Sequence, residues 1–368
     1  MDARSFPYDS YLGVKEKRDR FLREWADGQH PQDLPVIFVL PADAFSIWGA
    51  KCSTRESLLV ENLQGLALSA EWAGDSVYPH LEPWHGVGVY ANAFGCEYMW
   101  TGFDAPQTLP VYQHADELAE VARPNPRDAQ IMNMVLDTIR YFRRETHDRL
   151  PICLTDTQSP NDTASLILRS DEFFLVSSYE PERLGRFMTA VTELIIEFSE
   201  LQMEAIGPCL SQPGHNMLSV SPWKGISISD DNSALLSPTA YRVASLPFNS
   251  RIARHFGALA VHSCGVIAHN IPLLLQTPSL SQVDCHLAAI SDPNPNQPEQ
   301  IRDGFRGTGV LVKVSVDKED LPILERLLAP DLRCILEVWG VQSRAESEAV
   351  YGRFKAEVAR ITSTWGAP

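Results

Sequence analysis

The sequence lacks any long apolar run, and no window approaches the ~18–20 apolar residues that a membrane-spanning helix requires. Residues 1–7 contain no apolar segment of the kind that forms a signal peptide. Basic residues are scarce, since 31 Lys and Arg stand against 47 Asp and Glu, for a net charge of −16. A field of that sign repels nucleic-acid phosphates and anionic lipids. We therefore expect a cytoplasmic protein with a small-molecule substrate, and neither a nucleic acid nor a membrane as partner.

The sequence also lacks a disulfide framework. Its seven cysteines are an odd number and are scattered along 368 residues, whereas the cysteines of small secreted domains are paired and closely spaced. In a reducing cytoplasm, cysteines serve as packing residues, metal ligands or nucleophiles, and we expect most of these seven to pack in the core. Phosphate-binding loops of the Gly-x-Gly-x-x-Gly or Walker type are missing as well.

What the chain does contain is an alternation of short apolar runs with longer helical patterns. A charged amphipathic lead-in over residues 1–34 precedes roughly eight strand-length runs, most of them followed by a helix. The expected strands are residues 34–40, 76–78, 150–156, 226–228, 257–264, 282–289, 309–316 and 333–338.

Continuous apolar strands that alternate with helices indicate a parallel sheet buried on both faces. This pattern predicts an α/β fold, a TIM (β/α)8 barrel over residues 35–368 with an N-terminal helical extension over residues 1–34. In such a barrel the chemistry lies on loops at the carboxyl ends of the strands. An open doubly wound sheet is the alternative, disfavoured because its glycine-rich loop is missing.

His262 and Cys264 stand at the end of one expected strand and are followed by Gly265. Residues i and i+2 of a strand point to the same face, so the imidazole and the sulfur converge. This pair suits Zn²⁺, and the glycine would let the backbone turn behind it. The alternative is a buried cysteine beside a histidine that is hydrogen-bonded within the core.

Other polar clusters follow expected strands. Asp230 and Asp231 come directly after residues 226–228, where adjacent carboxylates can hold a metal, orient a cationic substrate or act as acid and base. An acidic turn before the helix that begins near Ser237 is the alternative for this pair. Weaker clusters that could line the same mouth comprise His80, Glu82, Trp84 and His85 in one loop, and Asp156 and Gln158 in another.

The order and spacing of these motifs resemble those of the uroporphyrinogen decarboxylase superfamily, which includes the zinc-dependent methylcobamide:coenzyme M methyltransferases. The matching stretches are Ala-Phe-Gly-Cys-Glu at 93–97, Ser-Pro-Asn-Asp-Thr-Ala at 159–164, the segment 230–238 with Tyr241 and Pro-Phe at 247–248, and His-Ser-Cys-Gly at 262–265. The resemblance covers about residues 35–360. It implies a TIM barrel with its site at the carboxyl-terminal mouth, and a homodimer at the level of the superfamily.

The loop after the first strand separates two branches of this superfamily. The decarboxylases carry an arginine-rich turn there, which clamps the carboxylates of the tetrapyrrole, whereas residues 39–45 hold no arginine and add Asp43. The methyltransferase branch resembles this chain more closely, because it carries His-x-Cys at the strand that ends in His262 and Cys264. It implies zinc bound by His262 and Cys264, and a corrinoid such as methylcobalamin, free or on a corrinoid protein, as methyl donor to a thiol.

The third zinc ligand of that branch is a distant cysteine, which would align near Gly340. Glu337 is the expected substitute, and Cys285 is the alternative. Their positions after expected strands make Asp230, Asp231, His80 and Glu82 the predicted catalytic residues. The residues predicted to bind substrate are Asp156, Gln158, Trp84, His85 and Trp339.

Two other functions stay open at this point. In a metal-free decarboxylase or lyase acting on a smaller substrate, Asp230 or Asp231 would be the acid or base, and His262 and Cys264 would be pocket wall. In a non-catalytic barrel, aromatic walls such as Trp84 and Trp339 would bind a neutral small molecule.

Overall fold

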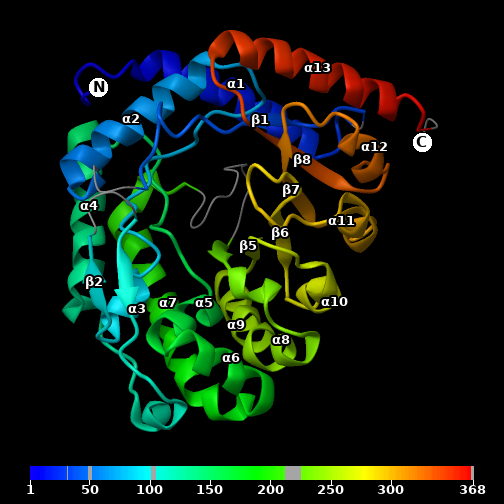
Figure 1. Cartoon of the computed structure of the whole chain (residues 1–368). Helices are drawn as coiled ribbons and strands as arrows, with labels where there is room; N and C mark the ends of the chain where they lie inside the picture. The colour runs from blue at the N-terminus through cyan, green and yellow to red at the C-terminus, as the bar shows by residue number, and fades with distance from the viewer. Residues whose placement is uncertain (31, 49–51, 101–104, 212–224, 366–368) are drawn as a thin grey trace.

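The structure, a computed structural model, describes residues 1–30, 32–48, 52–100, 105–211 and 225–365. Figure 1 shows the strands at the centre, with helices around them. The strands are β1 (Val36–Phe38), β2 (Glu97–Met99), β3 (Gln107–Leu109), β4 (Ile226–Ser229), β5 (Leu259–Ser263), β6 (Leu280–His286), β7 (Leu311–Asp317) and β8 (Arg333–Trp339).

The main sheet of the described residues has six parallel strands in the order β1-β8-β7-β6-β5-β4, and β2 and β3 form a separate antiparallel pair. Two irregular segments complete the ring between β1 and β4. Asp75 N donates to Val36 O over 2.8 Å, and isolated parallel bridges join Leu81 to Ile152 and Gln158 to Ser229. This arrangement, with helices outside a parallel sheet, confirms the TIM-barrel-like α/β fold.

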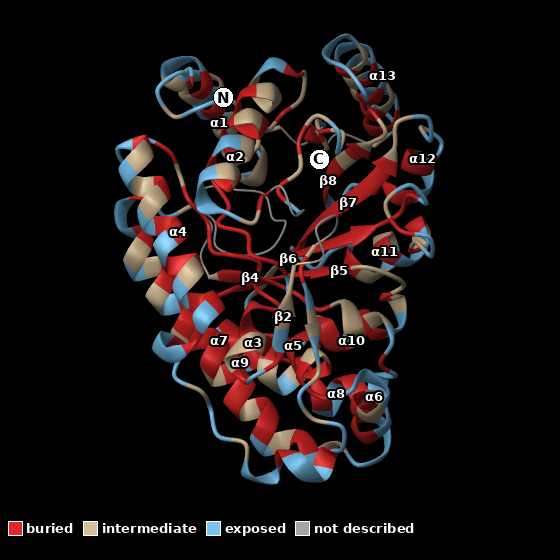
Figure 2. Ribbon diagram, turned by 60° about the vertical axis from the view of Figure 1, so that its left-hand side comes forward, coloured by how far each residue is buried: buried red, intermediate tan, exposed pale blue. Residues whose placement is uncertain are grey.

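The helices surround the sheet, and the faces of β7 and β8 are buried (Figure 2). None of the described helices is long and apolar enough to cross a membrane. The helices are α1 (Tyr8–Ala26), α2 (Arg55–Glu71), α3 (Val89–Ala93), α4 (Gln130–Thr146), α5 (Pro160–Ile167), α6 (Ser170–Tyr179), α7 (Gly185–Ile206), α8 (Pro238–Ala244), α9 (Leu246–Phe256), α10 (Ile271–Leu274), α11 (Pro298–Phe305), α12 (Ile323–Leu327) and α13 (Arg344–Thr362).

Helix α1 packs against the barrel. Its Leu22 is fully buried in a small apolar cluster with Ile37 of β1, Leu311 of β7 and Ile335 of β8. Leu311 lies at the first position of β7, so this cluster belongs to the amino-terminal end of the strands. The opposite, carboxyl-terminal end is the one that carries polar side chains.

Two predicted strands are not regular strands. Residues 76–78 form no bridge to another described residue, and residues 150–156 form only isolated bridges, from Ile152 to Leu81 and to Leu210, rather than a ladder. Pro151 lies in the second segment and Pro79 directly follows the first, and proline has no N–H to donate to a ladder. The predicted helix over 238–256 is also divided, into α8 and α9, with Pro247 in the first turn of α9.

Candidate active site

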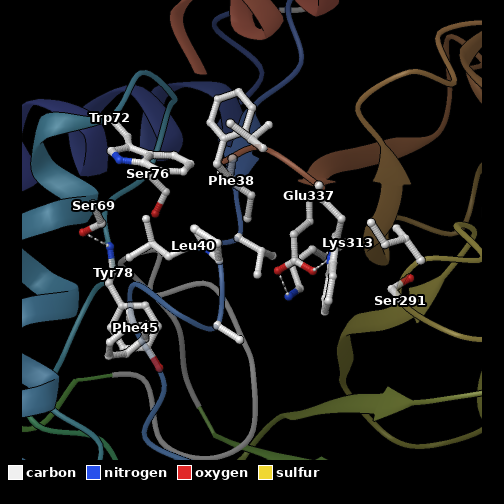
Figure 3. A pocket seen from close by; sticks show the side chains of 18 of the residues that line it. Phe38, Leu40, Phe45, Ser69, Trp72, Ser76, Tyr78, Ser291, Lys313 and Glu337 are labelled. Carbon is white, nitrogen blue, oxygen red and sulfur yellow. Dashed lines mark hydrogen bonds and ion pairs between the residues drawn. The ribbon is translucent and has the colours of Figure 1, made fainter. Parts of the chain in front are cut away.

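A cavity of about 800 Å³ opens at the carboxyl ends of the strands. Part of its lining is shown in Figure 3, where Lys313 and Glu337 lie beside the apolar side chains that follow β1. Lining residues come from β5, β6, β7 and β8, from the loop after β1 and from the segment 76–82. This is the end of a TIM barrel at which catalytic groups lie.

One inward-facing layer of the barrel is a continuous chain of charges across four neighbouring strands. His262 Nδ1 lies 2.8 Å from Asp284 Oδ2, and the same oxygen lies 3.3 Å from Lys313 Nζ. Lys313 Nζ also donates to Glu337 Oε1 over 2.7 Å, and Trp339 Nε1 donates to Glu337 Oε2 over 3.0 Å. The parallel register places these residues next to one another, since His262 pairs with Asp284 and Asp284 with Lys313.

The neighbouring charges in this layer shift one another's pKa values away from what burial alone would give. Burial alone would lower the pKa of His262, but the Asp284 carboxylate outweighs it and raises that pKa well above its usual value. Burial alone would raise the pKa of Asp284, but Lys313 and His262 lower it. Because a carboxylate only accepts, Nδ1 of His262 must be the donor in their bond. The other ring nitrogen, Nε2, faces Cys264, whose Sγ lies 3.2 Å away.

Together with two residues of the next layer toward the mouth, His262 forms a group of three side chains of the kind that bind metals. In the described part of the chain, ligand atoms of His262, Cys264 and His286 all lie within 4.8 Å of one another. His286 is two residues beyond Asp284 on β6, and its Nδ1 lies 3.0 Å from Ser315 Oγ of β7. Burial lowers the pKa of His286, which favours the neutral imidazole that a metal requires. Two imidazoles and a thiol fit Zn²⁺.

The third member of this group differs from the predicted one. Neither Glu337 nor Cys285 belongs to it. Glu337 lines the cavity but accepts hydrogen bonds from Lys313 and Trp339, one on each carboxylate oxygen. Cys285 is fully buried outside the cavity lining because it alternates with Asp284 and His286, which both face inward. The structure therefore places His286 where the sequence interpretation placed Glu337 or Cys285.

The loop after β4 completes the metal-ligand side of the cavity. Asp231 lines the cavity, and its Oδ1 accepts from Cys264 N over 2.7 Å and lies 3.6 Å from His262 Nε2. Gly265 has a φ of 75°, and a Cβ there would lie 3.0 Å from Ala234 Cβ. A glycine at this position thus lets the chain turn directly behind Cys264.

Asp230, predicted as a catalytic residue, does not line the cavity. It is fully buried, and its carboxylate accepts four hydrogen bonds, from Ser159 Oγ, Asn161 Nδ2, Ser245 Oγ and Asn249 Nδ2, over 3.1, 3.3, 2.8 and 2.7 Å. Burial raises the pKa of Asp230, and these donors counteract it. These contacts join the start of α5, β4 and the α8–α9 junction, so Asp230 has a structural role in this geometry.

His80 and Glu82 both line the cavity and are both uncharged near neutral pH. Burial lowers the pKa of His80 to about 3. Burial, together with the neighbouring Asp156 carboxylate, raises the pKa of Glu82 to about 8. Tyr78 donates to Glu82 Oε2 over 3.3 Å.

Of the residues predicted to bind substrate, one lies at the cavity and the others do not. Trp339 lines the cavity, whereas Asp156, Gln158, Trp84 and His85 lie behind its wall. Asp156 accepts from Gln158 Nε2 over 2.9 Å and from Trp84 Nε1 over 3.3 Å, and His85 Nε2 lies 2.9 Å from Thr138 Oγ1. These side chains support the segments next to the cavity from within the core.

Glu82 should make the folded protein less stable as the pH rises from about 4.5 to about 8. The carboxyl group is protonated in the folded chain up to its pKa of about 8 but ionised in the unfolded chain above the usual value of 4.5, so the unfolded chain binds fewer protons. The free energy of unfolding should fall by up to about 1.4 kcal/mol per pH unit from this group. Glu82→Gln keeps the shape without the charge, and its urea unfolding curves over this pH range should show a flatter dependence. Equal slopes of unfolding free energy against pH for the two proteins would contradict the raised pKa of Glu82.

The fold and the site define a TIM-barrel protein of the α/β class with a histidine–cysteine–histidine group at its mouth. The sequence matches the family model Uroporphyrinogen decarboxylase (URO-D) over residues 86–286, more than half of the chain. The chain belongs to this family, as its motifs predicted.

A solved structure of a methyltransferase from Methanosarcina mazei has the same fold, with a TM-score of 0.65, 14% sequence identity, and coverage of 93% of this chain and 98% of that one. No curated protein matches the sequence.

Proposed function

We propose that this member of the family is a zinc-dependent methyltransferase that moves a methyl group from a corrinoid to a thiol-type acceptor. The observation that carries the proposal is the convergence of His262, Cys264 and His286 on the cavity. The shared fold with a methyltransferase supports it. A corrinoid protein or free methylcobalamin is the partner that the proposal requires.

The donor set fits a catalytic zinc site. Catalytic zinc has three protein ligands and keeps a further position open for water or substrate. Asp284 behind His262 reproduces the carboxylate–histidine–zinc arrangement, which fixes the ring and its tautomer. Zinc bound here would act as a Lewis acid that lowers the pKa of an acceptor thiol to give a thiolate at neutral pH.

The chain's own residues have defined tasks in this reaction. The Lys313–Glu337 pair holds Asp284, and Asp284 holds His262 with Nε2 toward the cavity. Asp231 is the carboxylate beside the cluster that can accept the S–H proton. With a methyl-corrinoid as substrate, the thiolate sulfur would form a bond to the methyl carbon as the Co–C bond breaks, and the electron pair of that bond would stay on cobalt, taking it from Co(III) to Co(I).

The cavity does not favour the decarboxylation of a porphyrin with many carboxylates. No arginine occurs among the described lining residues, and Lys313 is already paired with two carboxylates. A porphyrin of this kind requires several cationic partners. A metal-free lyase with Asp230 as acid or base is disfavoured too, because Asp230 lies outside the cavity.

The proposal is tested with zinc-loaded protein, methylcobalamin and, in separate assays, an anionic, a neutral and a cationic thiol. We expect loss of the methylcobalamin absorption and formation of a methyl thioether with at least one thiol. The activity should disappear on removal of zinc and in Cys264→Ala. Cys285→Ala, which changes a buried cysteine outside the cavity, is the matched control and should retain activity. Turnover with none of the thiols, or equal turnover with and without zinc, would overturn the proposal.

A further inference from the structure

We infer that the acceptor taken by this cavity is an uncharged thiol with an apolar body, rather than an anionic thiol. This inference rests on the proposed function for the thiol itself. The apolar wall of the cavity and the pairing of its charged groups carry the statement about the rest of the ligand.

The wall next to the loop after β1 is apolar and largely aromatic. Phe38, Leu40, Phe45, Trp72 and Tyr78 line it, and Figure 3 shows them on the side of the ion pair away from Ser291. Phe45 packs edge-on against Tyr78, with ring centroids 4.8 Å apart, so these rings hold each other in place. A preformed wall of this kind binds an apolar body by removing both surfaces from water.

The charged groups of the cavity offer nothing to an anion. Lys313 is the one Lys or Arg among the described lining residues, and its side chain is only 5% exposed. Its Nζ already lies 3.3 Å from Asp284 and 2.7 Å from Glu337. Asp43 and Asp231 add two more acidic residues to the lining. With the thiol at the metal-ligand group, a sulfonate or carboxylate elsewhere on the ligand would lose its water without gaining a cationic partner.

The imidazole on this side of the cavity carries no charge. His80 lines the cavity with 7% of its surface exposed, and its Nδ1 is closed off from the cavity. Burial keeps this imidazole neutral, with a pKa of about 3. A neutral imidazole gives no charge to an anion.

Isothermal titration calorimetry of the zinc-loaded full chain tests the inference with three probes that share an ethanethiol unit. These are 2-phenylethanethiol, 2-mercaptoethanesulfonate and cysteamine, which are uncharged, anionic and cationic at the far end. We expect the Kd of 2-phenylethanethiol to be at least about tenfold lower than that of either charged thiol. A charged thiol that binds as tightly as 2-phenylethanethiol would overturn the inference.

A pair of variants tests whether charge causes the preference for the uncharged thiol over the anionic one. Ala42 is exposed on the loop after β1 and lines the cavity, so a longer side chain fits there without disturbing the core. Ala42→Arg should tighten the binding of 2-mercaptoethanesulfonate several-fold at low salt, whereas Ala42→Gln, which adds length without charge, should not. An unchanged preference in a folded Ala42→Arg protein would contradict the inference.

The outcomes also separate this inference from the proposed function, because binding is measured without methylcobalamin. Selective binding of 2-phenylethanethiol without methyl transfer would contradict the proposed function but support the ligand class. Methyl transfer combined with preferential binding of the sulfonate would support the proposed function and contradict the ligand class.

Discussion

Protein purified without a metal-binding tag is expected to hold about one zinc ion per chain, and Cys264→Ala and His286→Ala should each hold almost none. Each variant leaves two of the three ligand-type groups that lie within 4.8 Å of one another. Two remaining ligands on neighbouring strands do not retain zinc against dialysis with a weak chelator. Elemental analysis of the dialysed proteins measures the result.

Two further variants test whether the zinc ligands are the three residues that the structure brings together. Cys285→Ala should keep its zinc, because Cys285 is buried outside the cavity lining. Asp284→Asn should bind zinc about 10–100-fold more weakly, because it removes the carboxylate that holds His262 without removing a ligand. Full zinc in His286→Ala together with loss of zinc in Cys285→Ala would show that the ligand set is a different one. Circular dichroism of each variant separates loss of metal from loss of fold.

The barrel was predictable because its signals are local. Each apolar run followed by a helical pattern is visible within a short window, and their alternation indicates a parallel sheet. The segments 76–78 and 150–156 were predicted as strands because they are apolar and short, but among the described residues the first forms no bridge and the second forms only isolated bridges at Ile152. Whether such a segment forms a ladder depends on its neighbours in space, including the prolines that remove donors.

The metal-ligand group was predictable in part. His262 and Cys264 follow from the alternation of side chains along one strand. The same rule applied to residues 282–289 would have found Asp284 and His286 on one face, and that signal was missed. The pairing of Lys313 with Asp284 and Glu337 has no local signal, because it depends on the register of three strands, and a shift by one residue would turn each side chain to the other face.

The adjacent carboxylates Asp230 and Asp231 cannot be told apart in the sequence. In the structure, Asp231 lines the cavity, whereas the Asp230 carboxylate is surrounded by four donors from two other segments. Which of two neighbouring side chains points inward depends on the turn after β4. That turn is set by contacts with α5 and the α8–α9 junction, far away in the chain.

Asp230→Ala should therefore destabilise the fold by about 3–5 kcal/mol, because it leaves four buried donors without their acceptor. Asp231→Asn is the matched control, since it changes the neighbouring carboxylate, which is 45% exposed. We expect the free energy of unfolding of Asp231→Asn to lie within about 1 kcal/mol of the wild-type value, whereas its rate of methyl transfer should fall. Urea unfolding monitored by tryptophan fluorescence measures the first quantity, and the methylcobalamin assay measures the second. An Asp230→Ala protein that is as stable as wild type but has no turnover would contradict the structural role of Asp230 and indicate that it takes part in the reaction.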